Sequence, residues 1–289
     1  KGNTGIPIRV GWQIPWATEG QLTQILKHTN ILKDNGMSAE FTGFASGAPL
    51  NEAALAGSVD VIFTADQPAA TLLSVNPNWT IIGRLMYNRV SLYVPPKSPI
   101  QSVKDLKGKT VGMPFGAAAQ RMALEEEERA GLDPNKDVKN INLGILEQSD
   151  LVRDKNATKW GTVDALAGFD PTPAILEEKG LIRNLAVGKV VSVIVMSNTY
   201  IKAHPEAPVA FLKSMNSAYI YYRSNTAQAD DWFAAESKLY ITSHALQVAS
   251  SLEPNLQPNN NIRLSFNNDD IKALQDAADF IFNNKLIKT

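Results

Sequence analysis

The first hundred residues alternate short apolar runs with segments of helical period, and this alternation limits the chain to a small set of folds. Apolar, β-branched runs predict strands, and apolar residues spaced on one face predict helices between them. The predicted strands and helices follow one another at residues 6–12, 18–35, 41–44, 50–56, 59–63 and 68–73, with further strands at 80–85 and 89–94. A repeated strand and helix pattern indicates a mostly parallel sheet covered by helices, so we expect an α/β domain.

A second α/β unit follows the rigid, proline-rich segment at residues 95–99, with predicted strands at 109–113, 138–143 and 165–169 and predicted helices at 117–129 and 171–178. From residue 205 onward the predicted elements are all helices, at 209–224, 226–240, 243–251 and 269–284. A tail made only of helices is easiest to place on the first domain, which makes that domain discontinuous. We therefore predict lobe I at residues 1–89 and 194–289, and lobe II at residues 90–193. Two chain crossings, near 88–95 and 190–196, then form a hinge that could close on a ligand.

Composition narrows the partners of such a chain. Its 289 residues carry 28 Lys and Arg against 29 Asp and Glu, a formal charge of -1, so no global field attracts nucleic acid. The absence of Cys removes thiolate nucleophiles, iron–sulfur clusters and Cys-ligated zinc. The three histidines are scattered and offer no metal-ligand spacing. No phosphate-loop, dinucleotide or hydrolase motif is present, which favours binding over catalysis. We expect no nucleic-acid partner, metal or cofactor.

Ligands of α/β proteins bind where strands end and helices begin, so the strand-to-helix junctions are the first candidates for a binding site. Two junctions contain small residues that leave the first helical turn accessible to an anion. They are Ser46, Gly47 and Ala48 in the first lobe, and Phe115, Gly116, Ala117 and Ala118 in the second. The same composition also suits a tight turn with a helix cap, and the sequence leaves both interpretations open.

Other junction residues are more ambiguous. Asp66 with Gln67, and Asp170, precede prolines at the position of a helix N-cap, and each carboxylate could instead contact a cationic group of a ligand. Trp16 either stacks on a ligand or covers the edge of a core. Tyr87 and Asn88 lie at the predicted hinge and could reach the cleft.

An ordered series of segments resembles the periplasmic solute-binding proteins of ABC importers for sulfonates, nitrate, taurine and thiamine precursors, the SsuA/TauA and NMT1/THI5-like group. The segments are NGMSAEF at 35–41, SGAP at 46–49, ALAGSVDV at 54–61, SVKDLKGKTVG at 102–112, AGLDP at 130–134, GTVDA at 161–165 and FDP at 169–171. Together they cover about residues 6 to 215.

The resemblance implies a type II periplasmic-binding-protein fold, with two α/β lobes joined by a two-segment hinge. It implies that helix starts at Ser46, Gly47 and Ala48 and at Gly116, Ala117 and Ala118 hold an anionic group. Asp170 matches a position that holds the solute's amine in zwitterion-binding relatives, and Trp16 and Phe115 would form the walls. We expect a small anionic or zwitterionic solute, such as a sulfonate or taurine, and a membrane permease as partner of a monomeric binding protein.

Several alternatives stay open. The solute could instead be purely cationic, with Asp66 and Asp170 as its contacts, or it could be a thiamine precursor. The group also includes cysteine-dependent pyrimidine-synthesising enzymes, whose pattern this Cys-free chain lacks, and cofactor-independent enzymes that process a menaquinone precursor. A ligand-sensing domain of a larger receptor is a third class. The chain starts at Lys1 without an initiator Met, as mature exported proteins do, so we expect a periplasmic or extracellular protein, with a lipid anchor as an open possibility.

Overall fold

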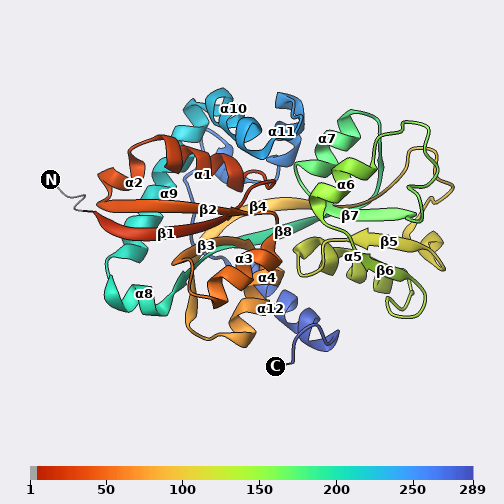
Figure 1. The fold of residues 1–289 in the computed structure, drawn as a ribbon, viewed down its shortest axis with the longest axis horizontal. Helices are drawn as coiled ribbons and strands as arrows, with labels where there is room; N and C mark the ends of the chain where they lie inside the picture. The colour runs from red at the N-terminus through yellow and green to blue at the C-terminus, as the bar shows by residue number, and fades with distance from the viewer. Residues whose placement is uncertain (1–4, 289) are drawn as a thin grey trace.

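Residues 5–288 of the computed structural model are described, and their strands form one mixed sheet (Figure 1). The expectation of a processed start concerns Lys1, which lies outside these residues. The sheet has the order β2-β1-β3-β8-β4-β7-β5-β6. Its strands are β1 (Ile6–Gln13), β2 (Met37–Phe44), β3 (Val61–Ala65), β4 (Trp79–Val94), β5 (Thr110–Met113), β6 (Lys139–Asn142), β7 (Ala165–Phe169) and β8 (Arg183–Ser197).

The two long strands β4 and β8 run through both halves of the sheet and pair with each other antiparallel along most of their length. β8 pairs with β3 from Ser192 to Met196, and β4 pairs with β7 from Val90 to Tyr93. The partners therefore change close to the predicted lobe boundaries, after residue 89 and before residue 194. Because β4 and β8 are the crossing segments, any rotation of the halves must bend these two strands.

Helices cover both faces of the sheet (Figure 1). Those in the first half and the tail are α1 (Glu19–His28), α2 (Ile31–Asp34), α3 (Gly47–Leu55), α4 (Asp66–Val75), α8 (Asn198–Ala203), α9 (Ala207–Ser224), α10 (Thr226–Ser237), α11 (Ser243–Ala249) and α12 (Asn268–Asn283). Those in the second half are α5 (Ala118–Arg129), α6 (Ile145–Leu151) and α7 (Thr172–Glu178). The short 3-10 turns are η1 (Val103–Leu106) and η2 (Pro254–Leu256). No helix within residues 5–288 combines the length and apolarity needed to cross a bilayer.

The C-terminal helices pack on the first half, where α9 and α10 contact α1 and α12 contacts α4. α12 also reaches α5 of the second half, and α11 contacts α7. Figure 1 shows α12 beneath the sheet, between α4 and α5. The tail is therefore anchored to one lobe and touches the other at two places.

Two details of the sequence prediction are wrong. The single helix predicted at 18–35 is divided into α1 and α2, because the backbone of Thr29 is extended (φ −120°, ψ 172°) and ends the first helix, with the Thr29 hydroxyl donating to the Ile25 carbonyl at 2.6 Å. The two strands predicted at 80–85 and 89–94 are one continuous strand, β4. Its polar middle residues looked like an interruption, yet Asn88 pairs with Val190 in the β8 register.

Candidate functional site

A small cavity lies between the two halves of the sheet, at the ends of the strands and beside the crossing strand β4. It is lined by Gln13, Trp16, Gly47, Ala65, Pro68, Asn88, Val90, Ala117, Ala118, Ala119 and Phe169. Its volume is about 10 Å³, which is room for roughly one water molecule. The lining residues come from both lobes, and we call this arrangement, with almost no free volume between the lobes, the closed form.

Two helix N-termini from opposite lobes meet at this cavity. The N-cap residues Ser46 and Ala117 make no side-chain hydrogen bond to the first turns of α3 and α5. In α5 the Gly116 and Arg121 N–H groups are already bonded to Gln120 and Gln67, so the N–H groups of the next lining residues, Ala118 and Ala119, are the ones that face the cavity. The helices are close: a Cβ atom built on Gly116 would lie 3.3 Å from the Ala48 Cβ atom. The positive ends of two helix dipoles therefore converge on one small space.

Small residues make this approach feasible. Gly116 has a φ of +85°, a conformation that residues with a side chain rarely adopt. A Cβ atom on Gly47 would lie 2.6 Å from the Pro68 Cγ atom. The two glycines let the chain turn into α3 and α5 without covering the helix ends.

Asn88 supplies a side-chain donor at the same place. It lines the cavity and is almost fully buried. Its Oδ1 atom accepts a hydrogen bond from the Ser192 hydroxyl, which leaves Nδ2 as the free group. Nδ2 has no hydrogen-bond partner among the described residues. A buried unpaired donor is costly, so this amide is suited to a ligand that brings an acceptor.

Aromatic rings form part of the cavity wall. Trp16 is 2% exposed and lines the cavity, together with Phe169 at the end of β7. Phe115, the second predicted wall, does not line the closed cavity and is 41% exposed. Its backbone N–H donates to Asn142 Oδ1 at 2.9 Å, which fixes the turn before α5.

Asp170 forms an ion pair within the protein. Arg89 donates from Nε to Asp170 Oδ2 at 2.5 Å and from Nη2 to Oδ1 at 3.2 Å. The Ala174 N–H also donates to Oδ1 at 3.0 Å, so the carboxylate serves α7 as a cap as well. Burial raises the pKa of the Asp170 carboxyl, and Arg89 opposes that shift. Asp170 is thus adjacent to the cleft with its charge already matched.

Asp66 and Gln67 hold the two lobes together. Asp66 Oδ2 accepts a hydrogen bond from Arg121 Nη2 of α5, and its Oδ1 accepts the Gln67 N–H at 2.7 Å. The Gln67 side chain donates to Gln120 Oε1 at 3.1 Å and accepts the Arg121 N–H at 3.1 Å. Burial raises the pKa of the Asp66 carboxyl, and Arg121 opposes that shift. These two predicted ligand contacts bond to the opposite lobe in the closed form.

Tyr87 lies away from the cavity. Its hydroxyl donates to Asp270 Oδ1 and accepts from Arg263 Nη2 at 2.7 Å. The Arg84 guanidinium lies 4.4 Å and the Lys189 ammonium 4.5 Å from its ring centre. The Tyr87 side chain therefore anchors α12 to the sheet.

Glu19, at the start of α1, is fully buried. Its Oε1 atom accepts the Gln13 N–H at 2.6 Å, and Gln13 itself lines the cavity. Burial raises the pKa of the Glu19 carboxyl well above its ordinary value. Burial therefore disfavours the charged form of Glu19, and the hydrogen bond from the Gln13 N–H opposes that shift.

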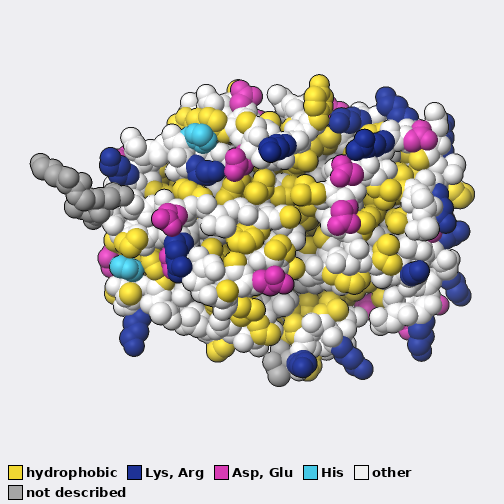
Figure 2. Space-filling view, in the orientation of Figure 1, with side chains coloured by type: hydrophobic (Ala, Val, Ile, Leu, Met, Phe, Trp, Pro, Cys, Tyr) yellow, Lys and Arg dark blue, Asp and Glu magenta, His cyan; other side chains and the backbone are white. Residues whose placement is uncertain are grey.

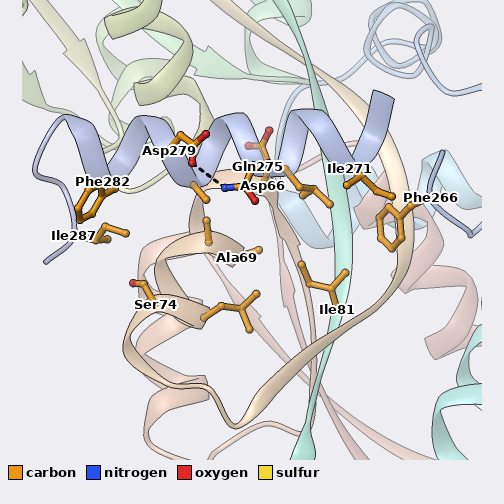
Figure 3. A pocket seen from close by; sticks show the side chains of 14 residues that line it. Asp66, Ala69, Ser74, Ile81, Phe266, Ile271, Gln275, Asp279, Phe282 and Ile287 are labelled. Carbon is orange, nitrogen blue, oxygen red and sulfur yellow. Dashed lines mark hydrogen bonds between the residues drawn. The ribbon is translucent and has the colours of Figure 1, made fainter. Parts of the chain in front are cut away.

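A larger cavity lies elsewhere, between α4 and α12 (Figure 3). It measures about 670 Å³, and Leu73, Ile81, Phe266, Leu274 and Phe282 are among its mostly apolar lining residues. Figure 3 shows Asp66 at this groove, alongside Gln275 and Asp279 of α12. The groove offers no unpaired donor and no basic side chain, so we place the candidate site in the cleft.

The face of the molecule drawn in Figure 2 carries no competing charged site. On the face shown in Figure 2, acidic and basic side chains are interspersed without a large patch of one sign. Within residues 5–288, no cluster of three or more His, Asp or Glu is placed to hold a metal ion.

Of the predicted residues, Trp16, Gly47, Ala117 and Ala118 line the cavity, and Ser46, Ala48 and Gly116 adjoin it. Asn88, which was expected to be able to reach the cleft, lines the cavity, whereas the prediction did not include Gln13, Ala65, Pro68, Val90, Ala119 or Phe169. Gln13 and Phe169 are the last residues of β1 and β7, and that position is the sequence signal that could have found them. Whether any of these residues contacts a solute stays a prediction.

The sheet order, two shared strands and an interlobe cavity define the fold class of periplasmic binding proteins. The alkanesulfonate-binding protein SsuA from Xanthomonas axonopodis pv. citri, bound to MOPS, superposes with a TM-score of 0.78 at 22% identity, over 98% of this chain and 94% of that chain. The periplasmic aliphatic sulphonate binding protein SsuA from Escherichia coli superposes with a TM-score of 0.79 at 21% identity, again over 98% and 94%.

Residues 32–229 match the family described as NMT1/THI5 like, and the chain belongs to that family. The fold is also shared by DszB, an enzyme, whose Cys-to-Ser mutant in complex with biphenyl-2-sulfinic acid superposes with a TM-score of 0.70 at 15% identity, over 98% of this chain and 93% of that chain. No curated protein matches the sequence.

Proposed function

We propose that the protein is the extracytoplasmic solute-binding component of an ABC importer, and that its solute is a small monoanion of the alkanesulfonate class. One observation carries this proposal: the uncapped N-termini of α3 and α5 converge on a cavity where the Asn88 amide has no acceptor. The two helix N-termini, each with the positive end of its dipole, and the Asn88 amide are donors that suit an oxoanion. The SsuA proteins of similar fold bind alkanesulfonates or MOPS.

The solute is proposed to lack a cationic group. An ammonium group in a closed cleft needs a carboxylate partner, because burying an unpaired charge is costly. Asp170 is bound to Arg89, and Asp66 is bound to Arg121. A taurine-like zwitterion would have to displace an arginine from one of these pairs. A simple sulfonate needs no such exchange.

Capture requires the cleft to open and close. A cavity of about 10 Å³ admits no sulfonate, so we propose that solute enters when the lobes separate and that the loaded form encloses it in a wider cavity than the one described. β4 and β8 are the segments that would bend. A closed, solute-loaded form is the state we propose a membrane permease recognises, with the binding protein acting as a monomer.

A matched pair of ligands tests the proposal. Isethionate and taurine have the same length and the same sulfonate, and differ in carrying a hydroxyl or an ammonium group. We expect isethionate, methanesulfonate or ethanesulfonate to raise the melting temperature, because a ligand of the folded form stabilises by about 2.7 kcal/mol at 100 times its Kd. Isothermal titration calorimetry is expected to give at least tenfold weaker binding of taurine. Tighter binding of taurine than of isethionate would refute the monoanion proposal.

The enzyme alternative has a separate readout. A sulfonate or a related ligand incubated with the protein and followed by mass spectrometry is expected to remain unchanged, since we propose capture without turnover. The chain has no Cys to act as a nucleophile. Product formation above that of a heat-inactivated sample would favour an enzyme on the same fold.

A further inference from the structure

The contact between α4 of lobe I and α5 of lobe II is built from polar side chains that lie beside the cavity. Gln120 Oε1 accepts hydrogen bonds from Gln67 Nε2 at 3.1 Å and from the Gly116 N–H at 2.9 Å. One amide oxygen thus joins the opposite lobe to the turn that precedes α5. A change in lobe contact here therefore acts directly on the helix N-terminus that faces the cleft.

The ion pair at this contact is removed from water. The Asp66 side chain is 0% exposed and the Arg121 side chain 12% exposed. Arg121 Nη1 also donates to Glu125 Oε1 at 3.2 Å, within α5. An intact buried ion pair contributes little net free energy to stability. Removing one partner leaves the other charge buried and unpaired, which destabilises the closed form in which that charge is buried.

The surroundings of Asp66 give it no other counter-charge. On its far side it borders the mostly apolar groove between α4 and α12, whose lining contains no Lys or Arg (Figure 3). Asp279 is the other acid of that lining, and it accepts from Gln275 Nε2 at 2.8 Å. The closed arrangement is therefore compatible with a charged Asp66 only because Arg121 reaches it from lobe II.

We infer that Arg121 is a positioning residue that sets solute affinity from outside the cavity, as a latch between the lobes. Its side chain is absent from the cavity lining, yet it compensates Asp66 only when the lobes are together. Measured affinity scales with the fraction of protein that can adopt the binding-competent form. The predicted effect on solute affinity rests on the proposed function, whereas the predicted effect on the distance between the lobes rests on the geometry of the ion pair alone.

The conformational test needs no solute. Because the chain has no Cys, Glu52→Cys in lobe I and Lys136→Cys in lobe II give two exposed positions for spin labels. Pulsed electron spin resonance on the ligand-free protein then reports the interlobe distance. Arg121→Met is expected to shift the distribution to longer distances than in the labelled parent. An unchanged distribution would overturn the latch, whether or not a solute is ever found.

The affinity test uses isethionate and three variants, one of them the Arg121→Met variant of the distance measurement. Arg121→Met is expected to raise the Kd at least tenfold. The double variant Asp66→Asn with Arg121→Met removes both charges and is expected to recover most of that loss, whereas a direct solute contact by Arg121 would not be recovered. Arg121→Lys keeps the cation and is expected to fall between the two. If Arg121→Met does not fold, Arg121→Lys and the double variant carry the comparison.

A matched control separates the latch from a general loss of charge. Arg153 pairs with Asp150 at 3.4 Å in the same lobe, and both side chains are exposed. Arg153→Met is expected to leave Kd and interlobe distance unchanged. Equal effects of Arg121→Met and Arg153→Met would show that net charge is responsible and would overturn the inference. A complete lack of isethionate binding by the parent contradicts the proposed function and leaves the distance measurement to decide on the latch.

Discussion

Replacing Asn88 by Asp tests the proposed anion site with the smallest change in shape. The substitution exchanges the unpaired Nδ2 donor for an acceptor and leaves an oxygen for the Ser192 hydroxyl, which now donates to Oδ1. The volume of the side chain and its packing beside Val90 are unchanged. Any loss of binding then reports on hydrogen-bond polarity and charge.

The expected magnitude follows from two contributions. A hydrogen bond to a charged acceptor contributes about 2 kcal/mol, so its loss alone weakens binding by about 30-fold. A like charge at roughly 4 Å adds about 4 kcal/mol of repulsion at an effective dielectric constant of 20. The introduced carboxyl can relieve that repulsion by taking up a proton, since burial and the anion both raise its pKa. We therefore expect Kd to rise at least 30-fold at pH 8, and to rise less at pH 5.

Isothermal titration calorimetry with isethionate at pH 5, 6.5 and 8 measures this effect, and circular dichroism checks that the variant is folded. Asn259→Asp, at an exposed position of the tail, adds the same charge far from the cleft and is expected to leave Kd unchanged. An Asn88→Asp variant that binds isethionate as tightly as the parent at pH 8 would falsify the assignment of the donor.

Three further substitutions probe the scaffold. Gly116→Ala places a side chain at a φ of +85° and 3.3 Å from the Ala48 Cβ atom, so it is expected to lower stability by about 1–2 kcal/mol and to weaken isethionate binding, as thermal melts and calorimetry would show. Burial raises the pKa of Glu127 to about 7, so the stability that this side chain contributes is complete below about pH 4.5 and is lost as the pH rises through 7. Glu127→Gln is therefore expected to raise the free energy of unfolding over that of the parent by up to about 3 kcal/mol at pH 8 and not at all at pH 4.5. Urea unfolding at the two pH values measures this difference. Glu253→Gln removes the charged partner of Arg84 from an ion pair whose side chains are both 0% exposed. It is expected to lower the free energy of unfolding by about 3–5 kcal/mol, measured with urea, because it leaves the Arg84 charge buried and unpaired. Adding Arg84→Met is expected to recover part of that loss, and no recovery in the double variant would contradict the uncompensated-charge explanation.

The elements of the fold were predictable because their signals are local. β7 (Ala165–Phe169) is a short buried apolar run, and the structure has it at the predicted residues. α12 (Asn268–Asn283) has its apolar residues at helical spacing and a capping box at its start. Short helices gave no such signal: α6 and α8, of 7 and 6 residues, were not predicted. Too few turns are present in them for an apolar face to stand out.

The candidate site was predictable only in part, because its geometry depends on residues from different lobes. The small residues at Gly47 and Ala118 are visible in the sequence, since both begin a helix after a strand. The free donor of Asn88 is not visible, because it exists only after β8 brings Ser192 to its Oδ1 atom. Asp66 and Asp170 looked available for the same reason, as their arginine partners lie 55 and 81 residues away.

The charge of the proposed solute follows from the groups that lie at the closed cleft. Arg121 is shared by Asp66 and Glu125, Arg89 is shared by Asp170 and Glu177, and burial disfavours the charged form of Glu19. The positive ends of two helix dipoles point at the cavity beside these paired groups, and they favour an anion such as a sulfonate. A zwitterion would bring an ammonium group into a space where every nearby carboxylate is already paired or favoured in its neutral form, so the same pairs that close the lobes also favour a simple monoanion.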